Sequence, residues 1–152
     1  MRKLIVGLGN HGMLNTRHSV GMQVANALVK RLGGEFKYDK ACSGYIAANL
    51  SYNGTELVIA KPKLLMNLNG RCASAAYRKY GIRDPSDVLL IHDDLDRAFP
   101  KLSIKHGGSA SGHNGVKSSM QTIMSDKMER LRIGIGKHCV LSSVRPVEPV
   151  HG

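Results

Sequence analysis

A histidine and a carboxylate in this sequence could do acid–base chemistry if the fold brings them together. His18 precedes an apolar stretch of helical spacing, and an imidazole ring titrates near neutral pH. A lone histidine is more often a surface or capping residue, so the interpretation requires a partner. Asp93 is the best candidate, because a carboxylate within hydrogen-bond reach fixes the imidazole tautomer and stabilises imidazolium. The pair predicts a general base.

Asn10 could lie at the same site. It follows the short apolar run 4–8, as Asp93 follows the run 88–91, and both runs read as buried strands. Ligands of open α/β sheets bind beyond the carboxyl ends of strands, so these side chains can meet although they are distant in sequence.

Two further asparagines are candidates. Asn114 lies in the glycine-rich segment 107–115 before a predicted helix, where free backbone amides could bind phosphate; a flexible loop is the alternative. Asn67 has no evident structural duty, whereas Asn69 is expected to be an ordinary helix N-cap.

Two other kinds of site fit parts of the sequence. The carboxylates in the segment 92–96 could bind a divalent metal, although a metal site needs further ligands. Residues 7–12 match the spacing G-x-G-x-x-G of dinucleotide-binding proteins, but no acidic residue closes a second strand about twenty residues on. The alternative is a tight turn whose glycines serve backbone geometry.

Strands and helices alternate along the chain. The hydrophobic patterns predict helices over 19–32, 69–80 and 116–124, and Asn53-Gly54 suits a hairpin turn. Strands are expected over 4–8, 45–50, 55–60, 88–91, 101–105 and 131–135. This order predicts an α/β fold, a single domain with a mixed β-sheet flanked by helices.

Composition limits the classes of protein. The chain has 152 residues and a formal net charge of +11, which favours a polyanionic partner, nucleic acid first; an ordinary basic enzyme fits the charge equally well. No apolar run approaches the ~20 residues of a membrane span. Three widely spaced cysteines suggest neither a zinc site nor a disulfide framework, which fits a reducing compartment.

Six segments, in order, resemble the bacterial-type peptidyl-tRNA hydrolase family. The turn before the second segment is more similar to vertebrate than to bacterial members. The segments are 4–10 (LIVGLGN), 16–21 (TRHSVG), 66–70 (MNLNG), 92–96 (HDDLD), 107–115 (GGSASGHNG) and 130–136 (RLRIGIG). The resemblance implies an enzyme without metal or other cofactor that hydrolyses the ester between a peptide and the terminal ribose of tRNA, which recycles the tRNA.

The resemblance also implies roles for residues of this sequence. His18 is expected to activate water, with Asp93 orienting and polarising it. The remaining positions serve binding: Asn10 and Asn67 position substrate and water, Asn114 holds the water or the developing oxyanion, Met66 and His113 line the cleft, and Lys105 and Arg132 hold the 5′-phosphate region of tRNA.

Three departures from the family pattern matter. His11 stands where the family usually has proline, and Pro100 where it usually has glycine. We expect residues 1–136 to form the hydrolase-like domain without the usual C-terminal helix, and residues 137–152 to be an irregular tail. The chain therefore looks like a shortened form, with low stability or weak activity as the consequence.

Alternatives remain open. A catalytically weak tRNA- or RNA-binding protein would keep the basic residues and tolerate loss of His18. A nucleotide-binding domain built on the glycine loops would bind small nucleotides without tRNA. For the hydrolase we expect peptidyl-tRNA as the partner, no membrane, a monomer, and the cytoplasm, or the mitochondrion if a leader lies in another isoform.

Overall fold

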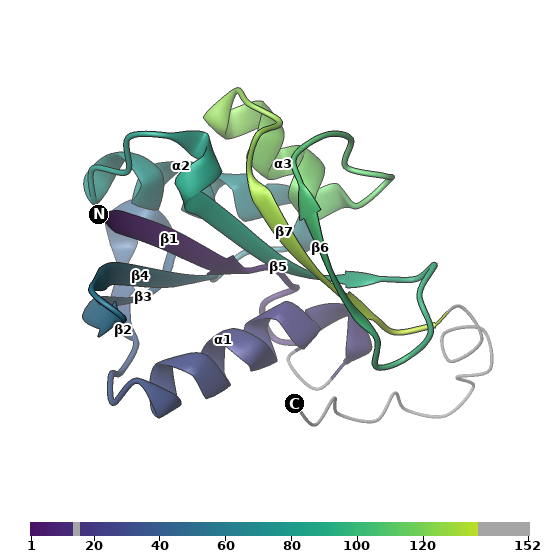
Figure 1. Ribbon diagram of the computed structural model, residues 1–152, viewed down its shortest axis with the longest axis horizontal. Helices are drawn as coiled ribbons and strands as arrows, with labels where there is room; N and C mark the ends of the chain where they lie inside the picture. Colours follow the sequence, from purple (N-terminus) through teal and green to yellow (C-terminus); the bar gives the residue numbers. More distant parts are fainter. Residues whose placement is uncertain (14–15, 137–152) are drawn as a thin grey trace.

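One seven-stranded sheet organises the molecule (Figure 1). The computed structural model describes residues 1–13 and 16–136. In the strand order β2-β3-β4-β1-β5-β7-β6, the four strands β4, β1, β5 and β7 are parallel, and the other three pair antiparallel to their neighbours. The strands are β1 (Arg2–Gly7), β2 (Lys37–Asp39), β3 (Gly44–Tyr52), β4 (Thr55–Pro62), β5 (Val88–Asp94), β6 (Leu102–His106) and β7 (Glu129–Gly134).

Helices cover both faces of the sheet (Figure 1). Because side chains alternate along β1, Leu4 and Val6 pack in one cluster and Ile5 in another. The first cluster lies under α2 (Asn69–Lys79) and α3 (Asn114–Ile123), and the second under α1 (Val20–Arg31). Each fully buried aliphatic side chain contributes roughly 1.5–3 kcal/mol to the free energy of unfolding.

Four short segments of the described chain are 3₁₀ turns. They lie between the longer elements and include the turns that precede α1 and α2. Their bounds are η1 (Arg17–Ser19), η2 (Lys40–Cys42), η3 (Met66–Leu68) and η4 (Pro85–Asp87).

Glycines let α1 approach the sheet closely. A Cβ on Gly7 would lie 2.4 Å from the carbonyl oxygen of Gly21, and a Cβ on Gly21 would lie 2.2 Å from that of Ile91. The helix therefore rests directly on β1 and β5 and places η1, with His18, at the carboxyl edge of these strands. The glycine spacing at 7–12 serves this packing and the turn at Gly12, whose φ is 86°.

The predicted elements are confirmed, with shifted ends. The hairpin turn at Asn53-Gly54 has positive φ at both residues. The structure adds the short strand β2, which was not predicted, extends β5 through Asp94, and starts α3 at Asn114. The predicted tail, residues 137–152, lies outside the described residues.

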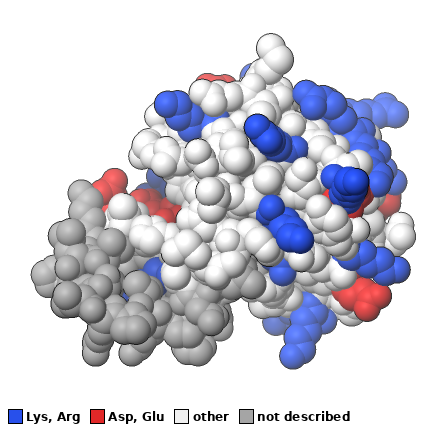
Figure 2. All heavy atoms as spheres, turned by 180° about the vertical axis from the view of Figure 1, so that it is seen from behind, with Lys and Arg blue, Asp and Glu red and all other residues white. Residues whose placement is uncertain are grey.

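Positive charge dominates the face in Figure 2. Lys and Arg side chains crowd the part of this face away from the grey residues, with few carboxylates among them. In the described part of the chain, no helix combines the length and the apolar character that crossing a membrane would require.

Candidate active site

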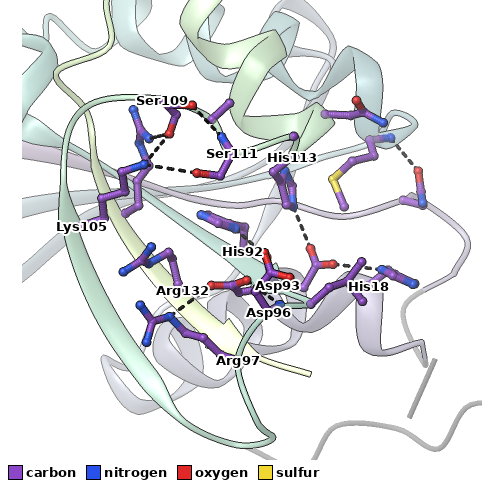
Figure 3. A pocket seen from close by; sticks show the side chains of 18 residues that line it. His18, His92, Asp93, Asp96, Arg97, Lys105, Ser109, Ser111, His113 and Arg132 are labelled. Carbon is purple, nitrogen blue, oxygen red and sulfur yellow. Dashed lines mark hydrogen bonds and ion pairs between the residues drawn. The ribbon is translucent and has the colours of Figure 1, made fainter. Parts of the chain in front are cut away.

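Two histidines hydrogen-bond the carboxylate of Asp93 at the end of β5 (Figure 3). His18 Nδ1 lies 2.9 Å from Oδ2, and His113 Nε2 lies 2.7 Å from Oδ1. Burial alone would raise the pKa of Asp93, but the hydrogen bonds from His113 and His18 outweigh it and hold that pKa well below its usual range. The carboxyl group is therefore an anion that accepts from both rings.

His18 has one ring nitrogen to spare. Its Nδ1 donates to Asp93, and its Nε2 has no hydrogen-bond partner within residues 1–13 and 16–136. The hydrogen bond to Asp93 raises the pKa of His18 above 6.5, against the lowering effect of burial. The predicted pairing of His18 with Asp93 is present, and its geometry fits a general base that works through Nε2.

His113 uses both ring nitrogens. Its Nδ1 accepts the backbone N–H groups of Gly115 at 3.0 Å and Val116 at 3.2 Å, which makes His113 the N-cap of α3. Because Nδ1 accepts, Nε2 must carry the proton that is donated to Asp93. The same cap removes free amides from this helix N-terminus, so the phosphate interpretation of the loop 107–115 is not supported there.

His92 lies beside His113, and no role for it was predicted from the sequence. Its Nδ1 donates to the carbonyl oxygen of Asp93 at 2.7 Å, and its ring lies 4.5 Å from the ring of His113 between centroids. Burial, with a contribution from His113, lowers the pKa of His92 to about 4, so this ring is neutral. In the sequence, only the position of His92 in the segment 92–96 pointed to a functional role for it.

A metal ion does not fit these three residues as they stand. His92, Asp93 and His113 offer ligand atoms within 4.8 Å of one another. However, Nδ1 of His113 is held by the helix cap and its Nε2 carries a proton, so neither nitrogen can coordinate a metal without losing the cap. The expectation that the chain needs no cofactor stays a prediction.

Asn10 is held through both its backbone and its side chain. Its backbone N–H donates to Ser19 Oγ at 3.1 Å, and its Oδ1 accepts from Met66 N at 2.6 Å. The Nδ2 amide has no partner among the described side chains and backbone groups, which leaves its protons for a ligand in the cavity that Asn10 lines.

Asn69 fixes this loop and is not the predicted N-cap. The capping residue of α2 is Leu68, with no side-chain hydrogen bond. The fully buried Asn69 side chain instead accepts from Gly9 N at 2.9 Å and donates to Gly9 O and Leu65 O at 3.0 and 2.9 Å. The N-cap prediction was wrong because the asparagine amide meets a distant loop rather than its own helix.

Of the other residues predicted to bind substrate, some line the cavity and one does not. Met66 and Asn114 line the same cavity as His18 and Asp93. Asn67 is exposed on η3 and is not a lining residue, so its proposed role in positioning substrate has no support from the cavity.

Cations line the other end of the cavity. Lys105 Nζ donates to Ser109 O at 2.7 Å, and Arg132 Nε donates to Ser103 Oγ at 2.9 Å. Arg130, for which no role was predicted from the sequence, is 1% exposed and donates to the carbonyl oxygens of residues 108, 109, 126 and 128. The loop 107–115 is thus tied to β6 and β7, contrary to the flexible alternative.

The cavity measures about 610 Å³. Figure 3 shows Lys105 and Arg132 on one side of it, His18 on the other, and His92, Asp93 and His113 between them. A basic imidazole nitrogen on a buried carboxylate, at the carboxyl edge of a mixed α/β sheet, is the arrangement that hydrolytic enzymes use to activate water.

Comparisons with known proteins agree with this class. The sequence model of the family "Peptidyl-tRNA hydrolase" matches residues 4–147. A probable peptidyl-tRNA hydrolase of Mus musculus is 43% identical over 138 residues, which cover 90% of this chain and 67% of the mouse protein. A peptidyl-tRNA hydrolase of Mycobacterium avium (strain 104) is 40% identical over 136 residues, 88% of this chain and 70% of that protein.

A solved structure is also similar. The crystal structure of peptidyl-tRNA hydrolase from Acinetobacter baumannii superposes with a TM-score of 0.82 at 33% identity, over 88% of this chain and 68% of that one. The chain belongs to the peptidyl-tRNA hydrolase family. The family resemblance and the α/β fold expected from the sequence are thereby confirmed.

Proposed function

We propose that this chain hydrolyses the ester between the peptide and the terminal ribose of peptidyl-tRNA, with His18 as general base. The observation that carries the proposal is the Nε2 of His18 at a cavity edge, which has no hydrogen-bond partner among the described residues, on a ring whose Nδ1 is held by Asp93. We further propose that a monomer carries out the reaction.

The first step is attack of water on the ester carbonyl carbon. His18 Nε2 removes a proton from the water as the new C–O bond forms, and Asp93 stabilises the resulting imidazolium through Nδ1. The carbonyl oxygen becomes an oxyanion. The amide protons of Asn10 and Asn114, which line the cavity, are suited to donate to it.

The second step breaks the ester bond. The tetrahedral intermediate collapses, the ribose oxygen leaves, and His18 returns its proton to that oxygen. The products are a peptide with a free carboxylic acid and a tRNA with a free ribose hydroxyl. His18 ends neutral and ready for the next water.

Lys105 and Arg132 would hold the phosphates of the tRNA. They lie in one cavity with the base but do not contact Asp93, so their effect should fall on binding rather than on bond cleavage. Each phosphate contact makes binding weaken as salt concentration rises.

The test is hydrolysis of N-acetyl-aminoacyl-tRNA by the chain and by His18→Ala. Loss of base catalysis should slow turnover by about 10²–10⁴-fold, while tRNA binding is retained. Equal circular dichroism spectra must first show that both proteins are folded. Turnover that survives in His18→Ala would contradict the assignment of the base.

A catalytically weak RNA-binding protein is the second candidate. The observation behind it is that Lys105 and Arg132 line the cavity and do not depend on His18 for their positions. A folded chain that binds tRNA with salt-sensitive affinity but shows no turnover would support this candidate. Lys105→Ala and Arg132→Ala should then weaken binding while His18→Ala does not.

A further inference from the structure

A second cluster of aromatic and basic side chains lies beside the cavity. Tyr38, Tyr45 and Lys61 are directly opposite one another on β2, β3 and β4, so they share one face of the sheet. His11 and Lys63 extend this row at the carboxyl end of β4. We call these five residues the tyrosine–lysine face.

The rings and cations of this face contact one another. Tyr38 and Tyr45 form an edge-to-face pair with centroids 5.5 Å apart, and His11 stacks on Tyr45 at 6.3 Å. Lys63 Nζ lies 4.9 Å from the centroid of the Tyr38 ring, and Lys61 Nζ lies 5.3 Å from that of Tyr45. The face is therefore a connected surface in which each cation lies near a ring.

The face is accessible and positively charged. Tyr38 is 51% exposed, and His11 and Lys63 are exposed as well. Lys61 Nζ donates to the neutral Asn26 at 2.7 Å, and within residues 1–13 and 16–136 neither lysine of the face has a carboxylate partner. Unpaired cations beside exposed rings suit a ligand with carboxylates or aromatic groups.

The tyrosine–lysine face adjoins the catalytic cavity at His11. His11 follows Asn10, which lines the cavity, and its backbone N–H donates to Leu64 O at 3.0 Å. Leu65, next to the lining residue Met66, is 57% exposed. A ligand that leaves the cavity past Asn10 and Met66 would reach His11 first.

The orientation of the substrate in the cavity determines whether its RNA part or its peptide part reaches the tyrosine–lysine face. Lys105 and Arg132 lie at the end of the cavity away from His18 (Figure 3). If these cations hold the RNA, and the ester lies at His18, the peptide leaves on the side of Asn10 and Met66. The face then meets the peptide rather than the RNA.

We propose that the tyrosine–lysine face binds the peptide part of the substrate and favours peptides with acidic or aromatic residues. This inference rests on the proposed function. Ring-to-ring steps of 5.5 and 6.3 Å each match about two residues of an extended peptide, which advances roughly 3.3 Å per residue.

The test compares three tRNA esters that share the same ester-linked amino acid. One carries an N-acetyl group, one a hexapeptide rich in Glu and Tyr, and one a hexapeptide rich in Lys and Ser. The readout is the ratio of kcat/KM for the acidic hexapeptide to that for the basic one, and the N-acetyl substrate normalises for active enzyme. We expect the ratio to exceed one, and Tyr38→Ala to lower it about two- to fivefold.

Lys63→Glu is the most discriminating variant. Because it reverses the charge, it should make the enzyme prefer the basic hexapeptide over the acidic one. Tyr52→Ala and Lys3→Glu are the matched controls. Tyr52 is 62% exposed at the opposite end of β3, Lys3 is exposed near the start of β1, and neither should alter the ratio.

Two results would overturn the inference. One is an unchanged ratio in both Tyr38→Ala and Lys63→Glu; the other is an equal loss on all three substrates, which would indicate contact with the RNA. If the wild-type chain hydrolyses none of them, the proposed function fails separately. Fluorescence anisotropy of the two labelled hexapeptides, without tRNA, then tests the face directly. The readout is the affinity for the acidic hexapeptide divided by that for the basic one.

Discussion

The segments that lead into α1 and α3 both bring a histidine to the carboxylate of Asp93, but they leave the two rings in different states. The side chain of His18 is 40% exposed, and its Nε2 has no hydrogen-bond partner in the part of the chain that the structure describes. The side chain of His113 is 12% exposed and has both nitrogens engaged, one by Asp93 and one by the backbone of α3.

This difference shows that backbone context, not residue type, assigns the chemical role. η1 presents His18 from the middle of a 3₁₀ turn and makes no side-chain cap for the helix that follows. The helix at α3 instead takes Nδ1 of His113 as its cap. A ring with a free nitrogen can accept a proton, whereas a ring with none can only orient its neighbours.

Replacing the shared carboxylate should have the largest effect. An amide in Asp93→Asn offers one oxygen and one NH₂ group, so it can accept from His18 or from His113 but not from both. We expect kcat for N-acetyl-aminoacyl-tRNA to fall by at least about 10²-fold. Glu56→Gln, which removes an exposed carboxylate paired with Arg2, is the control. Near-normal kcat in Asp93→Asn would show that the carboxylate does not orient the base.

The dependence of kcat/KM on pH should follow the protonation of His18 at Nε2. Only the neutral ring can accept a proton, so kcat/KM should increase about tenfold per pH unit below the pKa and level off above it. Because Asp93 raises the pKa of His18, the midpoint should lie above 6.5. Residual activity of Asp93→Asn should have a lower midpoint. A profile without a limb in this range would contradict the role of His18.

The capping role of His113 can be separated from its bond to Asp93. His113→Ala removes both and should lower the free energy of unfolding by about 1 kcal/mol, as loss of an N-cap does. Asparagine is a good N-cap but is too short to replace the imidazole at Asp93, so His113→Asn should restore stability and not activity. Urea denaturation and initial rates on the same preparations measure the two effects. Equal stabilities of the Ala and Asn variants would argue against the cap.

The sequence alone predicted the elements that depend on local pattern. The alternation of apolar residues, the Asn53-Gly54 turn and the strands before Asn10 and Asp93 were sufficient for the fold class and for the meeting of His18 with Asp93. These features follow from side-chain periodicity and from the geometry of parallel strands.

Long-range polar contacts could not be predicted in this way. Asn69 has the composition of an N-cap, yet its partner Gly9 is sixty residues away. Arg130 reads as one of two alternating arginines, and only the folded loop 107–115 supplies the carbonyl oxygens that make its burial favourable. The capping role of His113 likewise depends on where α3 begins, two residues earlier than the pattern indicated.

The smallest effect concerns stability rather than catalysis. A group whose pKa is higher in the folded protein than in the unfolded chain stabilises the fold at pH values below the unfolded pKa, and this contribution is lost as pH rises through the folded pKa. His18 is such a group, so its charged hydrogen bond to Asp93 should add stability near pH 6 that disappears at higher pH. Because solvent reaches the ring, we expect about 0.5 kcal/mol or less. The difference in free energy of unfolding between wild type and His18→Gln, measured with urea at pH 6 and pH 9, should therefore be slightly larger at pH 6. A difference that grows toward pH 9 would mean that the folded protein holds the neutral ring of His18 in preference to the charged one.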